Sequence, residues 1–246
     1  MAKLRADLAL VAQGLAESRT RAQALILAGN VFVGDRRVAK AGDLLAEEAV
    51  LSVKGRDHPW VSRGGVKLDH GLTHFGFDVT GAVALDVGSS TGGFTDVLLT
   101  RGARKVYAID VGTNQLAWKL RSDERVIVHE QTNARELTSA IVPEPIDIIV
   151  CDASFIALSK VLAAALGLAR PGARLVALVK PQFEAGRAEV GKGGVVRDPI
   201  VHQRVCEAAA TWIASQGWIV MGVERSPITG PEGNVEFLLG AIKDQI

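Results

Sequence analysis

Charged side chains follow several short apolar segments that are typical of buried β-strands. Asp86, Asp110 and Asp152 each come at the end of such a segment, and Lys180 follows the run Leu175–Val179. In open α/β sheets, ligands bind beyond the carboxyl ends of the strands. Carboxylates there can hold hydroxyl or amino groups, and a lysine can steer or move a proton. The pattern predicts a binding cleft, although a structural lysine at a sheet edge would simply extend outward.

A glycine-rich turn, Asp-Val-Gly-Ser-Ser-Thr-Gly-Gly-Phe at residues 86–94, follows the apolar run Ala82–Leu85. A strand that enters such a turn and opens a helix is typical of a nucleotide-type cofactor site, because glycines let the backbone approach a ligand. The glycines do not have the G-x-G-x-x-G spacing of dinucleotide folds, and an acid beside the turn disfavours a pyrophosphate. It suits a cationic or zwitterionic ligand such as the methionine moiety of S-adenosylmethionine, although the turn alone does not name the cofactor. The expected cofactor-binding residues here are Asp86, Gly88, Ser89, Gly92, Gly93 and Phe94.

Three further polar residues have both a structural and a cofactor-binding interpretation. Asp110 lies about twenty residues beyond the turn, where an acid usually holds ribose hydroxyls; the alternative is a cap for a helix over residues 112–120. Asn133 suits either an adenine edge or the cap of a helix through Leu137. Asp152 would either cap a helix or lie beside the ligand of the glycine turn. We expect Asp110, Asn133 and Asp152 to bind the cofactor.

The chain from about residue 67 onward alternates predicted helices and strands. This alternation is typical of an α/β fold with a doubly wound, mostly parallel sheet. Several strands are nearly continuous apolar runs, as expected for strands that are covered on both faces. The predicted strands are 82–87, 105–110, 126–129, 146–151, 173–179, 218–223 and 235–240, and Glu236 lies at the start of the last one.

The first forty residues contain seven Lys and Arg residues against three Asp and Glu residues. Apolar spacing predicts one short helix that ends near Gly14 and a second that begins after Ser18 and ends at Gly29. A hairpin that turns at Gly34–Asp35 and a strand over residues 49–53 are expected to follow. The basic side chains of these elements form either one binding surface or an ordinary solvated face. They are Arg5, Arg19, Arg21, Arg36, Arg37 and Lys40.

Pro59 and two glycines interrupt any periodic pattern between residues 54 and 66, which predicts a linker. Trp60 is expected to seal the domain junction, and Arg63, next to the glycines, is expected to meet a substrate. The predicted domain boundaries are residues 1–60 for a small N-terminal domain, 61–66 for the linker and 67–246 for a larger α/β domain.

Composition excludes several classes of protein. The chain has 246 residues, 48% of them hydrophobic, and a net charge of only +1. No run reaches the ~18 apolar residues of a membrane span, and the N-terminus has no apolar signal core, so we expect a cytoplasmic protein without a membrane partner. Cys151 and Cys206 have no disulfide or metal-ligand spacing, and the five histidines are scattered, so we expect no metal.

The segment from Leu4 to Gly34 resembles the RNA-binding domain named after ribosomal protein S-four. The resemblance is carried by Ser-Arg-Thr-Arg-Ala at residues 18–22 and by Ala-Gly-Asn-Val-Phe-Val at residues 28–33. In that family the helix and the following hairpin grip RNA. The resemblance implies phosphate contacts by Arg19 and Arg21 and recognition of structured RNA.

Lys67, Asp152, Lys180 and Glu236 match in order and setting the Lys-Asp-Lys-Glu tetrad of FtsJ-like ribose 2′-O-methyltransferases. With their flanking segments, the whole chain resembles the TlyA family, in which an S-four-type domain precedes an FtsJ-like domain. The resemblance implies a Rossmann-like class I methyltransferase fold with a seven-stranded sheet and S-adenosylmethionine as the cofactor. It also implies 2′-O-methylation of cytidine in ribosomal RNA, of the large subunit and, in some members, of the small one. The chain has Val66 directly before Lys67, the first lysine of the tetrad, where relatives often have His.

These residues can be given roles in such a reaction. A ribose hydroxyl is a poor nucleophile, so it must be aligned with the sulfonium methyl group and must lose its proton. We hypothesise that Lys180 orients and deprotonates the hydroxyl and that Lys67 positions the target nucleotide. Asp152 would hold Lys180 and approach the cofactor, and Glu236 would fix both lysines.

The segment 183–198 follows Lys180 and contains four glycines and three cations. It predicts a mobile substrate loop, the alternative being an ordinary exposed connection. Because the expected partner is ribosomal RNA or a ribosomal subunit, we expect basic residues here and in the N-terminal domain to contact RNA. The predicted RNA-binding residues are Arg5, Arg19, Arg21, Arg36, Lys40, Arg63, Arg187 and Lys192.

Three other functions remain as alternatives. A hydride-transferring Rossmann enzyme is disfavoured by the glycine spacing and the paired lysines. A binding protein or membrane-active toxin is a second alternative, because the TlyA family has been labelled haemolysin. No amphipathic or membrane-spanning segment in the sequence supports pore formation. A pseudouridine synthase can carry the same N-terminal domain, but it needs no methyl-donor site.

Overall fold

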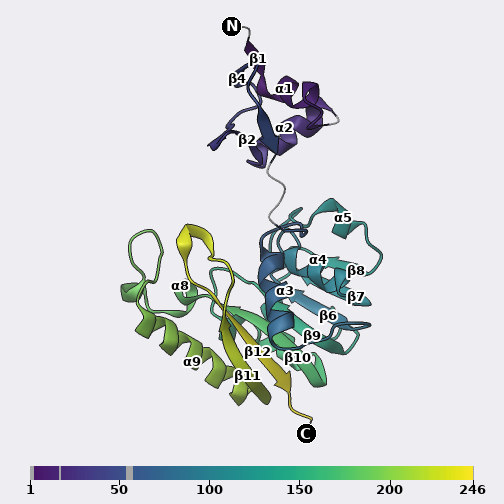
Figure 1. Cartoon of the computed structure of the whole chain (residues 1–246). Helices are drawn as coiled ribbons and strands as arrows, with labels where there is room; N and C mark the ends of the chain where they lie inside the picture. The colour runs from purple at the N-terminus through teal and green to yellow at the C-terminus, as the bar shows by residue number, and fades with distance from the viewer. Residues whose placement is uncertain (1–2, 17, 54–57, 246) are drawn as a thin grey trace. The chain divides into compact units, whose positions relative to one another are not determined.

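The computed structural model describes residues 3–16, 18–53 and 58–245 and divides between Pro59 and Trp60 into two compact units (Figure 1). The first unit is a small α+β domain with its own apolar core, which includes Leu10, Ile26 and Val31. Its elements are β1 (Lys3–Arg5), α1 (Ala6–Ala12), α2 (Arg19–Leu27), β2 (Val31–Val33), β3 (Arg36–Arg37), β4 (Leu44–Ala46) and β5 (Leu51–Val53).

Local signals explain most of the first unit. The Ser18 side chain caps α2 by accepting a hydrogen bond of 3.2 Å from the backbone N–H of Arg21. β2 and β3 form the predicted hairpin, in which Val33 pairs with Arg36 around Gly34 at φ +59°. The prediction missed β1 and β4, which pair with each other. Each has three residues, too few for an alternating pattern to be recognised.

The second unit contains a seven-stranded sheet in the order β11-β12-β10-β9-β6-β7-β8. β12 runs antiparallel between β10 and β11, and the pairs from β10 through β9, β6 and β7 to β8 are parallel. The mostly parallel sheet predicted from the alternating pattern is thus confirmed. The strands are β6 (Val83–Val87), β7 (Lys105–Ile109), β8 (Val126–His129), β9 (Ile146–Cys151), β10 (Ala169–Val179), β11 (Trp218–Arg225) and β12 (Phe237–Lys243).

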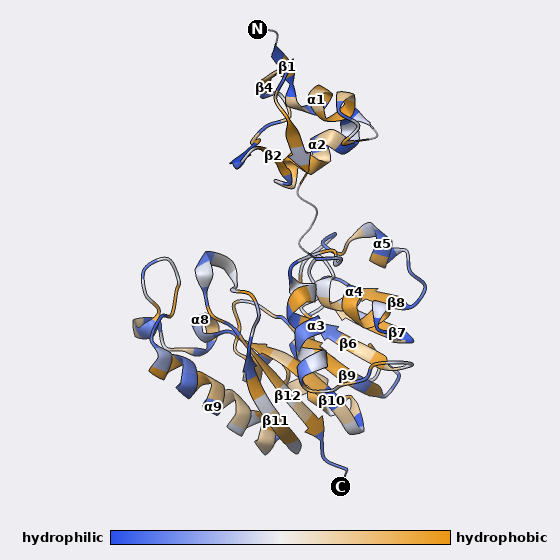
Figure 2. Cartoon of the chain, in the orientation of Figure 1, coloured by the Kyte–Doolittle hydropathy of each residue, from blue (hydrophilic) through white to orange (hydrophobic). Residues whose placement is uncertain are grey.

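Helices cover both faces of this sheet, and Figure 2 shows hydrophobic residues concentrated on its strands. Successive residues of one strand serve opposite cores: Ala84 packs in the cluster that contains Leu68, and Leu85 packs in the cluster that contains Ile213. The helices are α3 (Gly64–His74), α4 (Gly93–Thr100), α5 (Trp118–Arg121), α6 (Leu158–Val161), α7 (Ala163–Gly167), α8 (Pro181–Glu184) and α9 (Pro199–Ser215), with 3₁₀ turns η1 (Ala134–Glu136), η2 (Arg187–Glu189) and η3 (Pro231–Gly233).

The linker prediction is wrong for residues 64–66, which begin α3 and belong to the second unit. The two glycines do not break the helix; they allow close packing at its start. A Cβ atom on Gly65 would lie 2.3 Å from Cγ of Trp60. Trp60 is buried in the core of the second unit, together with Leu68 and Leu72 of α3. Residues 54–57 of the predicted linker lie outside the described residues.

The helix expected over residues 112–120 is also shorter, since α5 covers only Trp118–Arg121. Side chains hold the preceding backbone in an irregular path: Asp110 accepts from the N–H of Gly112, and Glu130 accepts from that of Gln115. Asn114 has a positive φ of 54°, which ends any helical run. In the described parts of the chain, no helix combines the length and the hydropathy needed to cross a membrane.

Candidate active site

The four residues of the predicted tetrad line one cavity at the carboxyl edge of the sheet. Its volume is about 330 Å³, and its wall includes Lys67, Asp152, Lys180 and Glu236. The chain runs from β6 to β7 and β8 in one direction and then returns to place β9 on the other side of β6. Ligands bind at such a reversal of strand order in α/β sheets. The glycine turn that follows β6 and Asp152 after β9 flank it.

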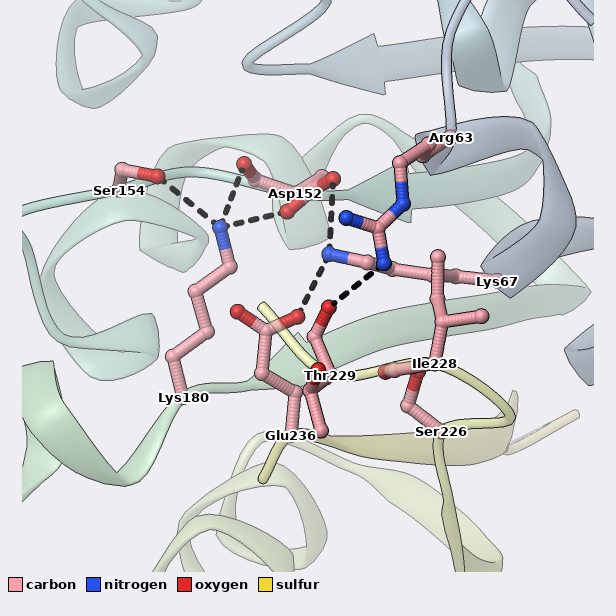
Figure 3. A network of polar contacts seen from close by, with 9 residues as sticks. All are labelled: Arg63, Lys67, Asp152, Ser154, Lys180, Ser226, Ile228, Thr229 and Glu236. Atoms are coloured by element: carbon pink, nitrogen blue, oxygen red, sulfur yellow. Dashed lines mark hydrogen bonds and ion pairs between the residues drawn. The ribbon is translucent and has the colours of Figure 1, made fainter. Parts of the chain in front are cut away.

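Lys180 directly follows β10 and has its ammonium group inside this cavity (Figure 3). Its Nζ lies 2.5 Å from Oδ1 of Asp152, and it donates to the backbone carbonyl of Asp152 at 3.2 Å and to Oγ of Ser154 at 3.0 Å. Only 6% of Lys180 is exposed. Three acceptors therefore surround a group that has three N–H donors when protonated. The predicted contact between Asp152 and Lys180 is present.

Lys67 lies on α3 and meets the two acids from the opposite side. Its Nζ donates to Oε2 of Glu236 at 2.6 Å and lies 3.9 Å from Oδ2 of Asp152. Lys67 is 7% exposed and Glu236 is 1% exposed, so the pair is almost completely removed from water. Glu236 contacts Lys67 but has no described contact with Lys180. Its predicted role in fixing both lysines is therefore direct for one and passes through Asp152 for the other.

A tight turn before β12 positions Glu236. The backbone N–H of Ser226 donates to the Glu236 carbonyl at 2.9 Å, and that of Gly230 donates to the Asn234 carbonyl at 2.8 Å. A Cβ atom on Gly230 would lie 2.2 Å from Oε1 of Glu236, so any larger residue there would displace the Glu236 carboxylate. Arg63 donates to the carbonyl of Thr229 at 3.3 Å across the cavity mouth (Figure 3).

A second cavity, of about 470 Å³, adjoins the first and shares Gly88, Ser90, Asp152 and Ser154 with it. Asp110 lies in its wall and accepts from the backbone N–H of Ser90 at 2.8 Å and from that of Gly112 at 2.7 Å. The remaining lone pairs of this fixed carboxylate can accept hydroxyl groups. Asn133 also lines the cavity and caps η1 by accepting from the N–H of Arg135. Asn133 thus has the predicted capping role, at η1, whereas Asp110 caps no helix over residues 112–120; cofactor binding by both residues stays a prediction.

The paired cavities suit S-adenosylmethionine. The second has an apolar wall that includes Val111 and Ile156, with Asp110 beside it, as an adenosine moiety requires. The first is polar and contains the acid Asp152, which suits the charged methionine moiety. Gly88 faces both cavities at φ +82°, where a Cβ atom would lie 3.0 Å from Cα of Ala153. The predicted residues Gly88, Ser89, Gly93, Phe94, Asp110, Asn133 and Asp152 all line one or both cavities.

Two predicted cofactor residues have a different position. Asp86 is fully buried and lines neither cavity; its Oδ2 accepts from Oγ1 of Thr95 at 2.7 Å. Burial raises the pKa of Asp86 to about 7, and the nearby carboxylates of Asp152 and Asp110 add to the increase. Gly92 also lines neither cavity, and a Cβ atom there would lie 2.3 Å from Cδ1 of Leu120. Its glycine serves the packing of the turn.

The basic residues of the first unit fall into two groups. Arg5 and Arg19 form ion pairs with Asp7, which is completely buried, at 3.0 and 2.9 Å. The hydrogen bonds from Arg5 hold the pKa of Asp7 well below its usual range, even though burial opposes this shift. Both arginines therefore stabilise the fold, with their side chains partly exposed. The other predicted RNA-binding residues of this unit, Arg21, Arg36 and Lys40, are exposed.

The segment 183–198 is more strongly anchored than a mobile loop would be. Glu189 forms an ion pair with Arg204 of α9 at 2.6 Å. Asn234 accepts from the N–H of Val196 and donates to the carbonyl of Gly194. The predicted residues Arg187 and Lys192 are exposed on this anchored segment.

Several residues of the site were not predicted. Ser154 accepts a hydrogen bond from Lys180. Ser62 packs against Gly93, where an added Cβ atom would lie 2.3 Å from Oγ of Ser62. Gly230 makes room for Glu236. The sequence Thr-Gly-Pro-Glu-Gly at residues 229–233, shortly before Glu236, was a visible turn signal that could have pointed to Gly230.

The expectation that no histidines cluster is wrong for two of the five. His70 and His74 lie one turn apart on α3, and both face Glu224 of β11. The i, i+4 spacing of the two histidines was visible in the sequence, but Glu224 lies 150 residues further along the chain, and only the fold brings it close.

Comparison with known proteins places the chain among methyltransferases. Residues 60–243 match the FtsJ-like methyltransferase family, and residues 4–51 match the S4 domain. Over 238 residues, which are 96% of this chain and 89% of the relative, it is 47% identical to the 16S/23S rRNA (cytidine-2′-O)-methyltransferase TlyA of Mycobacterium tuberculosis. The chain belongs to the TlyA family of FtsJ-like methyltransferases. Members of this family use S-adenosylmethionine, in agreement with the shape and polarity of the two cavities.

Other TlyA-family relatives carry a different name. The chain is 40% identical over 240 residues to Hemolysin A of Brachyspira hyodysenteriae, with 96% of this chain and 98% of the relative covered. A solved structure of a candidate hemolysin from Streptococcus thermophilus superimposes with a TM-score of 0.77 at 42% identity, covering 99% of this chain and 90% of that one. These likenesses extend over both units of the chain.

Proposed function

We propose that this FtsJ-like methyltransferase transfers a methyl group from S-adenosylmethionine to the 2′-hydroxyl of a cytidine ribose in ribosomal RNA. The observation that carries the proposal is the cluster of buried Lys67, Lys180 and Glu236 with partly buried Asp152, in the polar one of the two adjoining cavities that suit S-adenosylmethionine. The similarity to a relative named as a 16S/23S rRNA (cytidine-2′-O)-methyltransferase supports the choice of substrate.

The target hydroxyl requires alignment and the loss of a proton. Bound S-adenosylmethionine supplies an electrophilic methyl group on its sulfonium. Lys180, as the neutral amine, orients the 2′-oxygen toward that methyl group and accepts the proton as the oxygen–carbon bond forms and the sulfur–methyl bond breaks, with S-adenosylhomocysteine as the leaving group. Three acceptors around its Nζ stabilise the protonated amine. The protonated amine has no free lone pair, so Lys180 must lose one proton and be released from at least one of these contacts before it can accept the proton of the 2′-hydroxyl.

The other three residues keep Lys180 in position. Asp152 contacts both lysines, so it links the lysine of α3 with the lysine of β10. Glu236 fixes the ammonium group of Lys67, which then faces the cavity as a point charge for the ribose or a phosphate of the target. Arg63, exposed at the mouth, is placed to contact a neighbouring phosphate.

We assign RNA docking to the S4 domain in the first unit and methyl transfer to the second unit. Arg21, Arg36 and Lys40 present exposed cations on the first unit, and Arg187 and Lys192 do so on the second. Such contacts position an RNA through its backbone and account for most of the affinity. A protein that acts on ribosomal RNA or ribosomal subunits is expected to work in the cytoplasm.

The hemolysin name of some relatives suggests activity against membranes as a second candidate, but the structure offers it no direct support. In the described residues no helix can span a bilayer. Dye-filled phospholipid vesicles should remain intact when the purified protein is added. Leakage at protein concentrations that support methyl transfer would favour the second candidate.

The proposal is tested with labelled S-adenosylmethionine and unmethylated ribosomal RNA, either free or in separated subunits. The protein should transfer label to a ribose 2′-oxygen of cytidine in at least one of these substrates. Label found only on a base, or only on another RNA, would contradict the proposal even if the cofactor binds.

A further inference from the structure

His70, His74 and Glu224 form a compact group of potential metal ligands outside the active-site cavity. Nε2 of His70 lies 3.5 Å from Oε1 of Glu224, and Nε2 of His74 lies 3.8 Å from Oε2. The three ligand atoms all lie within 4.8 Å of one another. In a tetrahedral site with metal–ligand bonds of about 2.0–2.1 Å, neighbouring ligand atoms are about 3.3–3.4 Å apart. Small side-chain movements would therefore be sufficient to close the group around one cation.

The present contacts leave the hydrogen-bonding capacity of these three side chains partly unused. Nε2 of His70 is buried and has no hydrogen-bond partner among the described residues. One carboxylate faces two imidazoles at distances too long for good hydrogen bonds. A bound cation would satisfy all three atoms at once. The side chains of His74 and Glu224 are 44% and 34% exposed, so an ion can reach the site from solvent.

The backbone holds these ligands in place before an ion binds. His70 and His74 lie on consecutive turns of α3, and Glu224 pairs with Leu238 near the end of β11, the edge strand of the sheet. Helix and strand positions are more rigid than loop positions, which lowers the cost of assembling a site. The ligand set matters as well: imidazole nitrogens with one carboxylate favour Zn²⁺ and similar transition metals over Mg²⁺ or Ca²⁺.

We propose that His70, His74 and Glu224 bind a transition-metal cation of the Zn²⁺ class, with water at the remaining coordination position. The ion would join α3 to the sheet edge. Because Lys67 lies one turn before His70 on the same helix, the ion would fix the helix that carries one lysine of the active site. The proposal does not depend on which RNA the enzyme methylates.

The test measures Zn²⁺ binding to the full-length protein, purified without a polyhistidine tag, in competition with a chromogenic chelator. The variants are His70→Ala, His74→Ala and Glu224→Gln. His58→Ala is the matched control, because it also removes one histidine but from the other unit. The wild type and the control should bind one equivalent more tightly than the three variants do, and each variant should weaken this binding by at least about tenfold.

Thermal unfolding provides an independent measurement. Zn²⁺ should raise the melting temperature of the wild type and of His58→Ala, because an ion that binds the folded state stabilises it. The increase should be lost in all three variants. Glu224→Gln preserves the shape of its side chain, so its loss of binding could not be attributed to misfolding if its melting temperature without metal is unchanged. Equal Zn²⁺ binding by the wild type and all variants would overturn the proposal.

Discussion

Asp86 shows how the environment of one carboxylate differs from what its position in the sequence suggests. It stands at the end of a strand and before a glycine turn, which predicts a ligand-binding acid. The fold buries it completely and leaves its Oδ1 without a hydrogen-bond partner among the described residues. The resulting pKa of about 7 means that Asp86 is largely protonated in mildly acidic solution.

This pKa predicts how stability depends on pH. Between the ordinary carboxyl pKa of 3.8 and about 7, the unfolded chain has lost a proton that the folded chain keeps. Raising the pH across this range therefore lowers the free energy of unfolding, by up to about 1.4 kcal/mol per pH unit from this one group. Asp86→Asn should remove this contribution, so its stability relative to the wild type should increase from pH 5 to pH 8 in urea denaturation. A constant difference would contradict the shifted pKa.

The buried pair of Lys67 and Glu236 makes a second prediction at this scale. Glu236→Ala leaves a nearly buried ammonium group without its closest partner and should cost roughly 3 kcal/mol of stability. Replacing both residues, as in Lys67→Met with Glu236→Ala, should recover most of that loss, because no unpaired charge remains. Urea denaturation of the two single variants and the double variant measures this coupling. A double variant less stable than Glu236→Ala would contradict it.

The four residues of the tetrad and their order could be predicted through the resemblance to FtsJ-like methyltransferases, and Asp152 and Lys180 also through the apolar strands that they follow; Lys67 and Glu236 alone looked like surface charges. The partners of the four residues could not be predicted. Ser154 and Gly230 matter only through the distances to Lys180 and Glu236, which no local pattern encodes. Arg5 and Arg19 looked like free cations, because nothing in the sequence shows that the fold buries Asp7 between them.

At the scale of elements, glycines allow the start of α3 to pack closely against the start of α4. A Cβ atom on Gly93 would lie 2.3 Å from Oγ of Ser62 and 2.9 Å from the backbone nitrogen of Gly65. This contact sets where α3 begins and hence where Lys67 lies. The sequence identified the glycines but assigned Gly65 to a linker, since glycine pairs usually end regular structure.

Gly93→Ala should therefore displace the first turn of α3. We expect a loss of about 1–3 kcal/mol in stability together with weaker S-adenosylmethionine binding, because Gly93 also lines the first cavity. Gly167→Ala in α7 is the matched control, since no atom lies within 4 Å of its added Cβ, and its stability should change by less than about 0.5 kcal/mol. Calorimetry of unfolding and of cofactor binding measures both effects. Equal behaviour of the two variants would contradict this account of the junction.

The anchored segment 183–198 presents three exposed cations, of which Arg187 and Lys192 are predicted to contact RNA. Replacing either with alanine should weaken RNA binding and reduce the slope of log affinity against log salt by up to about one unit, because one phosphate contact is lost. S-adenosylmethionine binding should not change. Arg204→Ala, which releases the anchor on Glu189 without removing either cation, is the comparison. If the salt dependence is unaltered in the Arg187 and Lys192 variants, this segment does not contact RNA.

At the scale of the whole molecule, the chain forms two units with separate cores, one that matches the S4 domain and one that matches the FtsJ-like methyltransferases. The class of each unit could be predicted, because alternating apolar segments specify the parallel sheet and a basic helix-hairpin pattern marks the small domain. The antiparallel position of β12 between β10 and β11 followed from no local pattern, because strand order depends on long-range pairing. That position matters, since it brings Glu236 to the lysine of α3.

The central claim is that Lys180 acts on a ribose hydroxyl in ribosomal RNA beside bound S-adenosylmethionine. The most direct test is single-turnover methyl transfer by the wild type and by Lys180→Ala, with the product digested to nucleosides and identified by mass spectrometry. The account predicts 2′-O-methylcytidine from the wild type and a rate at least about a hundredfold lower from the variant, with similar cofactor affinity. Near-normal transfer by Lys180→Ala, or a product without 2′-O-methylcytidine, would contradict it.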